Sequence, residues 1–227
     1  SYAESFKPTP PQIVDGYGKG FPPEKANQKE VGAKVDLLHN QLGLLVSVYD
    51  ITRNSVSEPV PQLFDANGIQ VYRNLSQTSK GVEVSVNYQP IPNFQVQIGY
   101  SYDDARISQS AQPTSMNAEI ANAPRHSANL WTRYNFVDST LRGFGVGLGL
   151  IHTGRRNGVL SNDPAAMLTI PSNTRADLAF YYKWKRYDFS IFVSNVTDQA
   201  YIASADAATD VVPGAPRKIT ASVKYAF

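Results

Sequence analysis

The C-terminal stretch, residues 187–227, reads YDFSIFVSNVTDQAYIASADAATDVVPGAPRKITASVKYAF and decides the fold class. Apolar residues occupy every second place in residues 187–193 and again in residues 219–227, with mostly polar residues between them. A period of two is the spacing of a β-strand, in which successive side chains point to opposite faces. We therefore expect two amphipathic strands, the second of which closes on Phe227.

The connection between these strands holds two short motifs, NVTDQAY at residues 195–201 and GAPR at residues 214–217. Asn and Asp suit the exit of a strand because their side chains can cap backbone groups. Proline suits the start of a strand, where no ladder donor is needed. Together the two motifs resemble the C-terminus of TonB-dependent receptors. The closing YAF of residues 225–227 resembles the terminal strand of bacterial outer-membrane barrels.

Three other segments resemble the same receptors. Residues 23–34 combine Pro-Glu with Glu-x-Gly-x-Lys, residues 80–83 read KGVE, and residues 124–131 begin with Pro-Arg-His and end with Leu-Trp. The resemblance covers essentially the whole chain, and it is carried by the order and spacing of the motifs rather than by any one of them.

The composition limits the function classes. The 227 residues include no cysteine and three histidines, and the formal net charge is +2. The lack of cysteine excludes a disulfide framework and thiolate metal sites, and a charge near neutral gives no support to nucleic-acid binding. No apolar run is long enough for a transmembrane helix. The half-polar strands of a membrane barrel remain possible because their hydropathy signal is weak.

The rest of the chain alternates between amphipathic strands and two kinds of connection. Strands are expected at residues 30–37, 42–53, 80–89, 94–103, 124–134, 143–150, 174–184, 187–193 and 218–227, with the end of a tenth at residues 1–6. Long loops are expected at residues 7–27, 54–77, 107–123 and 155–171, and short turns at residues 39–41, 90–93, 138–142 and 185–186. Short turns at one end and long loops at the other are the layout of an outer-membrane barrel.

Two local patterns refine this picture. Residues 65–68, Asp-Ala-Asn-Gly, predict a small hairpin turn inside the second long loop. Residues 143–149 place a glycine at every second position, which does not match the GxGxxG fingerprint of a nucleotide loop and has no helix after it. The glycines instead predict a strand with one bare face, which neighbouring side chains or an enclosed domain can approach.

Aromatic residues separate a membrane barrel from a soluble β-sandwich, which shows the same alternation. Rings on the apolar face lie beside the short turns on strand after strand: Tyr88, Phe94, Tyr134, Phe136, Phe144, Tyr182, Trp184, Tyr187, Tyr225 and Phe227. A row of rings at one height is typical of an interfacial girdle at a membrane surface. The pattern therefore favours the barrel, with the soluble sandwich as the alternative.

The resemblance implies an all-β fold, in which residues 1–227 form the C-terminal portion of an antiparallel transmembrane β-barrel. About nine to ten strands of a 22-stranded barrel would be present, with long extracellular loops and short periplasmic turns. The N-terminus lacks the basic start and apolar core of a signal peptide, so we expect a fragment without the family's N-terminal plug.

The implied function is TonB-dependent uptake of ferric siderophores across the bacterial outer membrane. The implied partners are the siderophore, the TonB energy-coupling complex acting through the missing plug, outer-membrane lipid and lipopolysaccharide, and the barrel-assembly machinery. Alternatives are another cargo such as a cobalamin or a glycan, a passive porin or autotransporter barrel, and a soluble β-sandwich that binds a ligand.

No catalytic or metal-binding pattern is present in the sequence, so an enzyme is not expected. His39, His126 and His152 have no partner at metal-ligand spacing. Asp103 and Asp104 are adjacent in a strand and point to opposite faces, so they cannot act as paired carboxylates. No cofactor is expected, because iron would pass only as a ferric siderophore.

Candidate binding residues follow from the implied function. Arg offers paired donors to carboxylates and Tyr offers a flat face and a hydroxyl. The loop candidates for contact with cargo are Tyr17, Phe21, Phe64, Tyr72, Arg73, Arg155, Arg156 and Tyr201. The candidates that face the lumen and a plug are Glu30, Lys34, Glu83, Arg133, Arg175 and Asp177. Tyr225 and Phe227 are the expected assembly signal. Loop packing and solvated ion pairs are the competing explanations for the first two groups.

Overall fold

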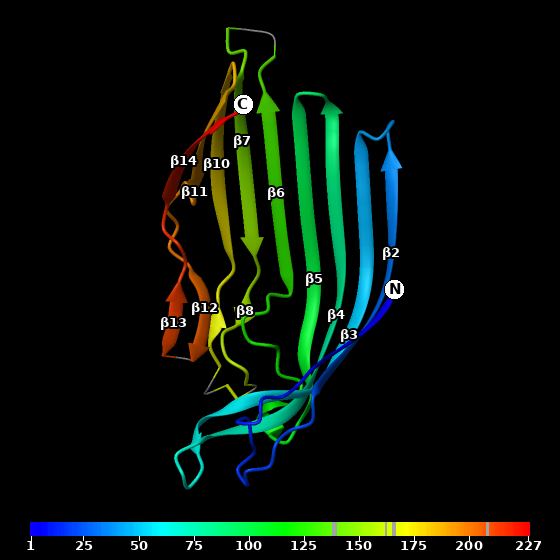
Figure 1. Ribbon diagram of the computed structural model, residues 1–227, viewed down its shortest axis with the longest axis vertical. Helices are drawn as coiled ribbons and strands as arrows, with labels where there is room; N and C mark the ends of the chain where they lie inside the picture. The colour runs from blue at the N-terminus through cyan, green and yellow to red at the C-terminus, as the bar shows by residue number, and fades with distance from the viewer. Residues whose placement is uncertain (138–139, 162, 165–166, 208) are drawn as a thin grey trace.

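The computed structural model describes residues 1–137, 140–161, 163–164, 167–207 and 209–227. In this part of the chain, one antiparallel sheet holds ten strands in the order β1-β2-β3-β4-β5-β6-β7-β10-β11-β14, as Figure 1 shows. Its strands are β1 (Tyr2–Lys7), β2 (Glu24–Leu37), β3 (Leu42–Phe64), β4 (Gln70–Ile91), β5 (Phe94–Ser110), β6 (His126–Asn135), β7 (Phe144–Thr153), β10 (Asn173–Trp184), β11 (Tyr187–Ser194) and β14 (Lys218–Tyr225). The expected count of nine strands and the end of a tenth is confirmed.

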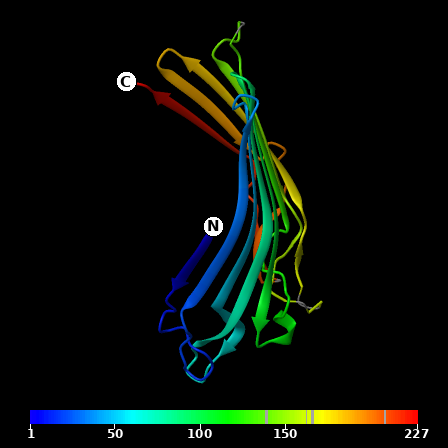
Figure 2. The same cartoon turned by 90° about the vertical axis from the view of Figure 1, so that its right-hand side faces the viewer.

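Two small ribbons and one helical turn lie in the long connections. They are β8 (Arg156–Asn157) with β9 (Thr169–Ile170), β12 (Ile202–Ala207) with β13 (Asp210–Pro213), and the 3-10 turn η1 (Pro113–Ser115). Short turns join the strands at one end of the sheet, while the ribbons and the tip of the β3–β4 hairpin lie at the other end (Figures 1 and 2). We call these the short-turn end and the long-loop end.

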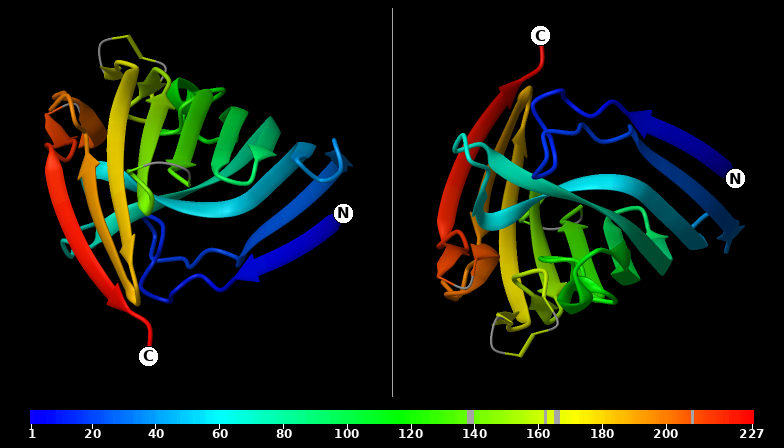
Figure 3. Two further views of the ribbon diagram at one scale, coloured as in Figure 1. Left: turned by 90° about the horizontal axis from the view of Figure 1, so that it is seen from above. Right: turned by 90° about the horizontal axis from the view of Figure 1, so that it is seen from below.

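The sheet is curved and open. Seen along its strands it forms an arc, with β1 and β14 at the two ends of the arc (Figure 3). Each of these two strands pairs on one side only, β1 with β2 and β14 with β11. The sheet is therefore an open arc that does not close within the described residues.

Register partners separate an apolar face from a polar face. One apolar row runs across five strands through Ala33, Val46, Val84, Tyr100 and Ala128. The next row, one residue along each strand, is polar and runs through Gly32, Ser47, Glu83, Ser101 and Ser127. Such alternation is what the period of two in the sequence predicts.

The polar face lies on the concave side of the sheet. Trp131 of β6 and Phe192 of β11 both point from the polar face, and their ring centroids are 6.1 Å apart although β7 and β10 lie between their strands. Side chains that converge across two intervening strands indicate the inside of the curve. Gly147 and Gly149 allow the approach, since an added Cβ would lie 2.8 Å and 2.9 Å from the Trp131 ring. The prediction of a bare strand face open to neighbouring side chains is confirmed.

The apolar face carries a band of rings near the short turns. Phe144 stacks on Tyr182 at 4.3 Å, Tyr187 lies 5.0 Å from Tyr225, and Tyr225 meets Phe227 edge-on at 5.2 Å. Further ring contacts link Phe94 to Tyr134 and Tyr134 to Phe136, and Trp184 to Tyr187. Nine of the ten aromatic residues identified in the sequence thus make ring contacts in this band, while Tyr88 makes none with the described residues.

The prediction of a long loop at residues 54–77 is wrong, because most of these residues belong to strands β3 and β4. Most of residues 54–77 continue the β3–β4 ladder, and only residues 65–69, which contain the predicted turn at residues 65–68, separate the two strands. A bulge between Arg53 and Val56, with Ser55 at φ 60°, bends this hairpin across the long-loop end of the concave side (Figures 1 and 3). Polar composition suggested a loop, but pairing of the two halves satisfies their backbone groups and makes them strands.

The turn at residues 65–68 itself is confirmed. The Asp65 carboxylate accepts hydrogen bonds from the backbone N–H groups of Asn67 and Ile69, both at 2.8 Å. Gly68 takes a φ of 76°, in the left-handed region where glycine has no Cβ penalty. Hydrogen bonds from the Ile69 and Asn67 backbone lower the pKa of the Asp65 carboxyl.

Two other strands extend six to seven residues beyond their predicted bounds, into the loops predicted at residues 7–27 and 107–123. β2 begins at Glu24 rather than residue 30, and β5 continues to Ser110. The turn at Lys185, which has a φ of 53°, is confirmed. The predicted turn at residues 138–142 begins at Asp138, outside the described residues.

Candidate functional site

The long connections pack together into one unit at the long-loop end. We call it the loop cluster, and it consists of residues 118–123, the β8–β9 ribbon and the β12–β13 ribbon. The Asn122 side chain donates to the Ala205 carbonyl at 2.8 Å and accepts from the Ala205 N–H at 2.9 Å. The Asn122 backbone N–H donates to the Asn157 carbonyl at 2.7 Å. One asparagine thus joins three connections that are far apart in the sequence.

Arg156 is the second link within the loop cluster. It is only 4% exposed, and its Nη2 donates to the carbonyls of Ile202 at 3.0 Å and Ala203 at 2.6 Å. Burial lowers the pKa of the guanidinium, which nevertheless stays charged at neutral pH because an arginine pKa lies so far above it. Its Nη1 is buried without a hydrogen-bond partner among the described residues. Arg156, which belongs to β8, therefore holds the first two residues of β12 in place.

Tyr201 connects the loop cluster to the polar face. Its hydroxyl accepts from Nη1 of Arg175 at 3.2 Å, and Nε of the same arginine lies 3.3 Å from Oδ1 of Asp177. The same Oδ1 accepts from the backbone N–H of Asn195 at 2.8 Å. A side chain at Gly214 would collide with the Tyr201 ring, so a glycine is required there.

The motifs at residues 195–201 and 214–217 fix the connection between β11 and β14. Asn195 has a φ of 50° and donates from Nδ2 to the carbonyls of Gln199 at 3.0 Å and Ala215 at 3.1 Å. Asp198 accepts from the Arg217 backbone N–H at 2.7 Å. The predicted capping by Asn195 and Asp198 is confirmed, and it explains why these residue types stand at this exit.

The loop candidates for cargo contact fall into different surroundings. Tyr17 is 98% exposed, Phe64 is 56% exposed at the hairpin end, and Arg155 is exposed beside the loop cluster. Phe21 and Tyr72 are half-buried, and the Tyr72 backbone donates to the first long loop at Val14 at 3.2 Å.

Three of the candidates are engaged within the chain itself. Arg73 pairs with Glu58 at 2.6 Å and also contacts the Gln112 side chain. Arg156 and Tyr201 hold the loop cluster, as described above. Contact with cargo stays a prediction for all eight candidates, and Tyr17, Phe64 and Arg155 present the most accessible side chains.

The lumen candidates all lie on the polar face. Glu30, Lys34 and Glu83 come from the β2–β4 side of the arc, while Arg133, Arg175 and Asp177 come from β6 and β10. Arg133 lies over the Tyr181 ring, 4.0 Å from its centroid. Contact of these residues with a plug stays a prediction.

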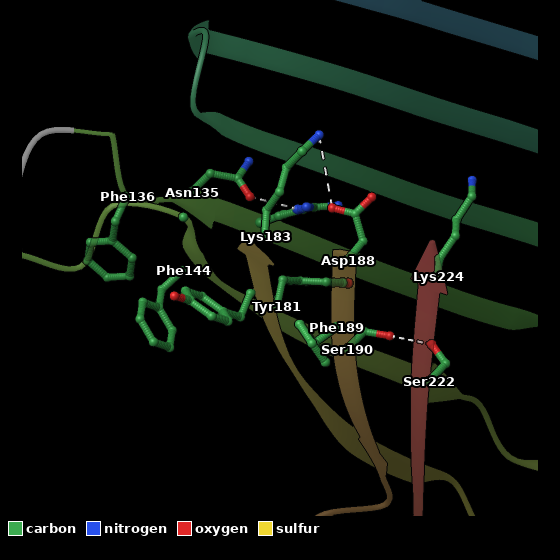
Figure 4. Close-up of a pocket in the computed structure, with 13 residues that line it drawn as sticks. Asn135, Phe136, Phe144, Tyr181, Lys183, Asp188, Phe189, Ser190, Ser222 and Lys224 are labelled. Atoms are coloured by element: carbon green, nitrogen blue, oxygen red, sulfur yellow. Dashed lines mark hydrogen bonds and ion pairs between the residues drawn. The ribbon is translucent and has the colours of Figure 1, made fainter. Parts of the chain in front are cut away.

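A pocket of about 580 Å³ lies at the short-turn end beside Arg133. Figure 4 shows the polar side chains that line it from β10, β11 and β14, with the rings of Phe136 and Phe144 at its apolar side. Lys183 lies 4.0 Å from Asp188, and Ser190 is hydrogen-bonded to the Ser222 hydroxyl at 2.7 Å. The sequence reading missed this group, although the alternation in residues 183–190 and 218–224 places its members on one face.

Two features are absent from the described residues. They contain no group of three or more His, Cys, Asp or Glu side chains that could hold a metal ion. They also contain no helix long and apolar enough to span a membrane.

Comparison with known proteins identifies a family model and relatives of similar sequence. A family model described as TonB dependent receptor-like, beta-barrel, matches residues 1–196. The ferrioxamine B receptor of Salmonella typhimurium is 28% identical over 236 residues, which cover 100% of this chain and 31% of that receptor. The metal-pseudopaline receptor CntO of Pseudomonas aeruginosa is 27% identical, over 97% of this chain and 30% of that receptor.

Solved structures share the fold. The pyoverdine receptor FpvA of Pseudomonas aeruginosa matches with a TM-score of 0.79 at 22% identity, over 100% of this chain and 33% of that chain. The closed form of the ferric-catecholate import receptor Fiu of E. coli matches with a TM-score of 0.74 at 24% identity, over 98% of this chain and 32% of that chain. The chain therefore spans about a third of the length of these relatives.

Proposed function

Because this chain belongs to the TonB-dependent receptor-like β-barrel family, we propose that it forms the C-terminal part of the barrel of a receptor for ferric siderophores in the bacterial outer membrane. One observation carries the proposal. The whole chain aligns with a receptor named for ferrioxamine B, and its fold matches receptors named for pyoverdine and for a ferric catecholate. The iron is cargo in this proposal, and the protein is a transporter rather than an enzyme.

The two faces of the sheet support a barrel wall over a soluble sandwich. Large apolar side chains on the apolar face are widely exposed, with Val31 at 74%, Ile219 at 67% and Val223 at 63%. A sandwich would cover such a face with a second sheet. Lipid would cover it in a membrane, with the aromatic band at the periplasmic interface. The lipopolysaccharide-rich leaflet would then lie toward the long loops.

The loop cluster supports a receptor over a passive pore. Arg156 and Asn122 hold several connections in one arrangement, whereas a simple pore needs no such cross-links between loops. A fixed arrangement reduces the ordering cost of binding a compact cargo. The accessible Tyr17, Phe64 and Arg155 supply rings and a cation for an anionic or aromatic chelate.

The remaining partners follow from the family. The energy for uptake would come from the TonB complex, acting on a plug domain encoded outside residues 1–227. Tyr225 and Phe227 would be read by the barrel-assembly machinery. A second candidate cargo is a metal chelate other than a ferric one, which the similarity to a metal-pseudopaline receptor favours.

Ligand binding by the full-length receptor tests the proposal. We would measure quenching of tryptophan fluorescence during titration with ferrioxamine B, ferripyoverdine and a ferric catecholate, with a cobalamin and a maltodextrin as other cargo classes. Saturable binding of one ferric siderophore is expected, and Arg155→Ala should weaken it roughly tenfold to a hundredfold, since a charge-assisted contact contributes about 1.5–3 kcal/mol. The matched control, Asn54→Ala, changes an exposed residue of β3 and should leave binding unchanged. Binding of cobalamin or glycan without any ferric siderophore would replace this proposal by one of the alternatives.

A further inference from the structure

The apolar face carries a groove of about 400 Å³ at the short-turn end. It is lined mainly by side chains that alternate along β7, β10 and β11, namely Phe144, Val146, Phe180, Tyr182, Phe189 and Ile191. We call these six residues the apolar groove. Figure 4 shows Phe144 and its neighbour Phe136 on one side of the strands, whereas Lys183 and Lys224 point to the other side.

The apolar groove runs along the strands. Its outer tier consists of three rings, in which Phe144 stacks on Tyr182 at 4.3 Å and Tyr182 lies 6.2 Å from Phe189. Its other three members are register partners of one another, two residues further from the short turns. Two residues of a strand span about 7 Å. The groove therefore extends from the aromatic band toward the middle of the apolar face, as a chain-like ligand requires.

The connection between β6 and β7 forms a side of the groove and is held in place. Phe136 and Leu141 of this connection also line it. The Phe136 N–H donates to the Phe144 carbonyl at 2.9 Å, and the Phe144 N–H donates to the Leu141 carbonyl at 2.9 Å. The groove is thus formed before any ligand arrives, which reduces the ordering cost of binding.

Two cations stand at the outer end of the groove. Lys185 and Arg186 form the turn between β10 and β11, and both are exposed without an ion-pair partner among the described residues. Nζ of Lys185 lies 5.1 Å from the centroid of the Trp184 ring, which belongs to the apolar face. The short turns at residues 38–41 and 92–93 contain no Lys, Arg, Asp or Glu. The β10–β11 turn therefore brings positive charge to the place where the groove opens.

We propose that the apolar groove and the Lys185–Arg186 turn bind one phospholipid of net negative charge, of the phosphatidylglycerol type. One acyl chain lies in the groove, and the phosphate oxygens accept hydrogen bonds from the two cations. Phosphate is the group that arginine and lysine bind with charge-assisted hydrogen bonds. The inference rests on the membrane location that the proposed function assigns to the apolar face.

The spacing of rings and cations fits such a lipid. Tyr182 and Phe189 each lie three residues from the turn, which is about 10 Å along a strand and about 7–8 Å along the membrane normal for a strand tilted by about 40°. The headgroup region adds about 5–8 Å on each side of the hydrocarbon core. With the rings at the edge of the hydrocarbon, Lys185 and Arg186 lie at the level of the phosphate.

The charge decides against other occupants of the groove. A zwitterionic phospholipid would bring its own ammonium group toward two cations. A second copy of this chain, packed on the same patch, would place the same cations on both sides of the contact. A lipid with one net negative charge satisfies the turn and supplies a chain for the groove.

Native mass spectrometry of the full-length receptor tests the proposal. The receptor is freed of lipid in detergent and titrated with phosphatidylglycerol and with phosphatidylethanolamine that carry the same acyl chains. We expect one phosphatidylglycerol to bind roughly tenfold to thirtyfold more tightly than phosphatidylethanolamine, since each cation near an anionic lipid contributes roughly a factor of five.

Two sets of variants separate the headgroup from the chain. Lys185→Asn suits the turn because Lys185 has a φ of 53°, which asparagine tolerates. Combined with Arg186→Gln, it should remove most of the preference for phosphatidylglycerol. The matched control, Lys224→Gln, changes an exposed lysine at the same end but on the polar face, and it should keep the preference.

Filling the groove tests the position of the acyl chain. Val146→Trp should weaken binding of phosphatidylglycerol by roughly threefold to tenfold, because the added ring occupies the space of the chain. Val48→Trp makes the same change at an exposed apolar-face residue of β3, and it should leave binding unchanged.

Equal binding of the two lipids would overturn the proposal, and so would equal binding of phosphatidylglycerol in the turn variants and their control. Unchanged binding in Val146→Trp would overturn it as well. A lipid-free dimer that excludes phosphatidylglycerol would assign the groove to a second copy instead. These outcomes do not depend on cargo: a receptor that selects phosphatidylglycerol but binds no siderophore refutes the proposed cargo and leaves the lipid site intact.

Discussion

The loop cluster depends on Asn122, and removing its side chain should release the β12–β13 ribbon. Asn122 has a φ of 62°, so Asn122→Gly is the suitable change, since glycine accepts this backbone conformation without strain. The substitution removes both hydrogen bonds to Ala205, which is only 1% exposed. The backbone groups of Ala205 are then left without their partner in a buried position.

The size of the effect follows from these contacts. A net hydrogen bond contributes about 0.5–1.5 kcal/mol, and an unpaired buried group costs about 1–3 kcal/mol. We expect the free energy for local opening of the ribbon to fall by about 2–3 kcal/mol, less than the sum because water enters the opened site. At about 1.4 kcal/mol per factor of ten, exchange of the Ala205 amide should become roughly 30- to 100-fold faster.

Hydrogen exchange followed by mass spectrometry on the full-length receptor measures this change. Asn117→Gly is the matched control, because Asn117 lies in the same loop at a φ of 58° and is exposed. Equal exchange in Asn117→Gly and Asn122→Gly would refute the reasoning, since backbone flexibility alone would then explain the change.

Three further outcomes are expected. Gly149→Val places a side chain where an added Cβ would lie 2.9 Å from the Trp131 ring. The variant should shift tryptophan fluorescence, and its free energy of unfolding in denaturant should fall by about 1–3 kcal/mol. An unchanged fluorescence spectrum would contradict this packing. The folded-state pKa of Asp65 is lowered, so its stabilisation of the turn is complete above its unfolded pKa and is lost as pH falls through the lower folded value. Exchange of the Ile69 amide should show this acid dependence, and Asp65→Asn should abolish it. Deletion of Phe227 should sharply reduce the amount of receptor in the outer membrane but leave the heat stability of folded receptor nearly unchanged. Normal surface levels of the truncated receptor would refute the assembly signal and leave Phe227 as an interfacial anchor only.

Local alternation in the sequence was sufficient to predict the sheet. Strands such as residues 174–184 and 187–193 have one apolar and one polar face, and their short turns set the antiparallel order. The extension of β3 and β4 was missed because residues 54–77 lack clean alternation. Their strand conformation comes from pairing between the two halves of the hairpin, a property that neither half shows alone.

The candidate site was less predictable because it depends on contacts between distant residues. Asn122 and Ala205 are 83 positions apart, and nothing local distinguishes Asn122 from other loop asparagines. Arg156 was identified as a cationic candidate, but its burial against the β12 carbonyls appears only in the fold.

Uptake of cargo is the most direct test of the central claim. Cells that carry the full-length receptor as their only route for a given ferric siderophore would be supplied with that chelate bearing radioactive iron. The proposed function predicts saturable uptake that disappears when TonB is removed and when the inner-membrane energy source is collapsed. Uptake that persists without TonB would indicate a passive pore, and the absence of uptake for every ferric siderophore that the receptor binds would contradict the claim.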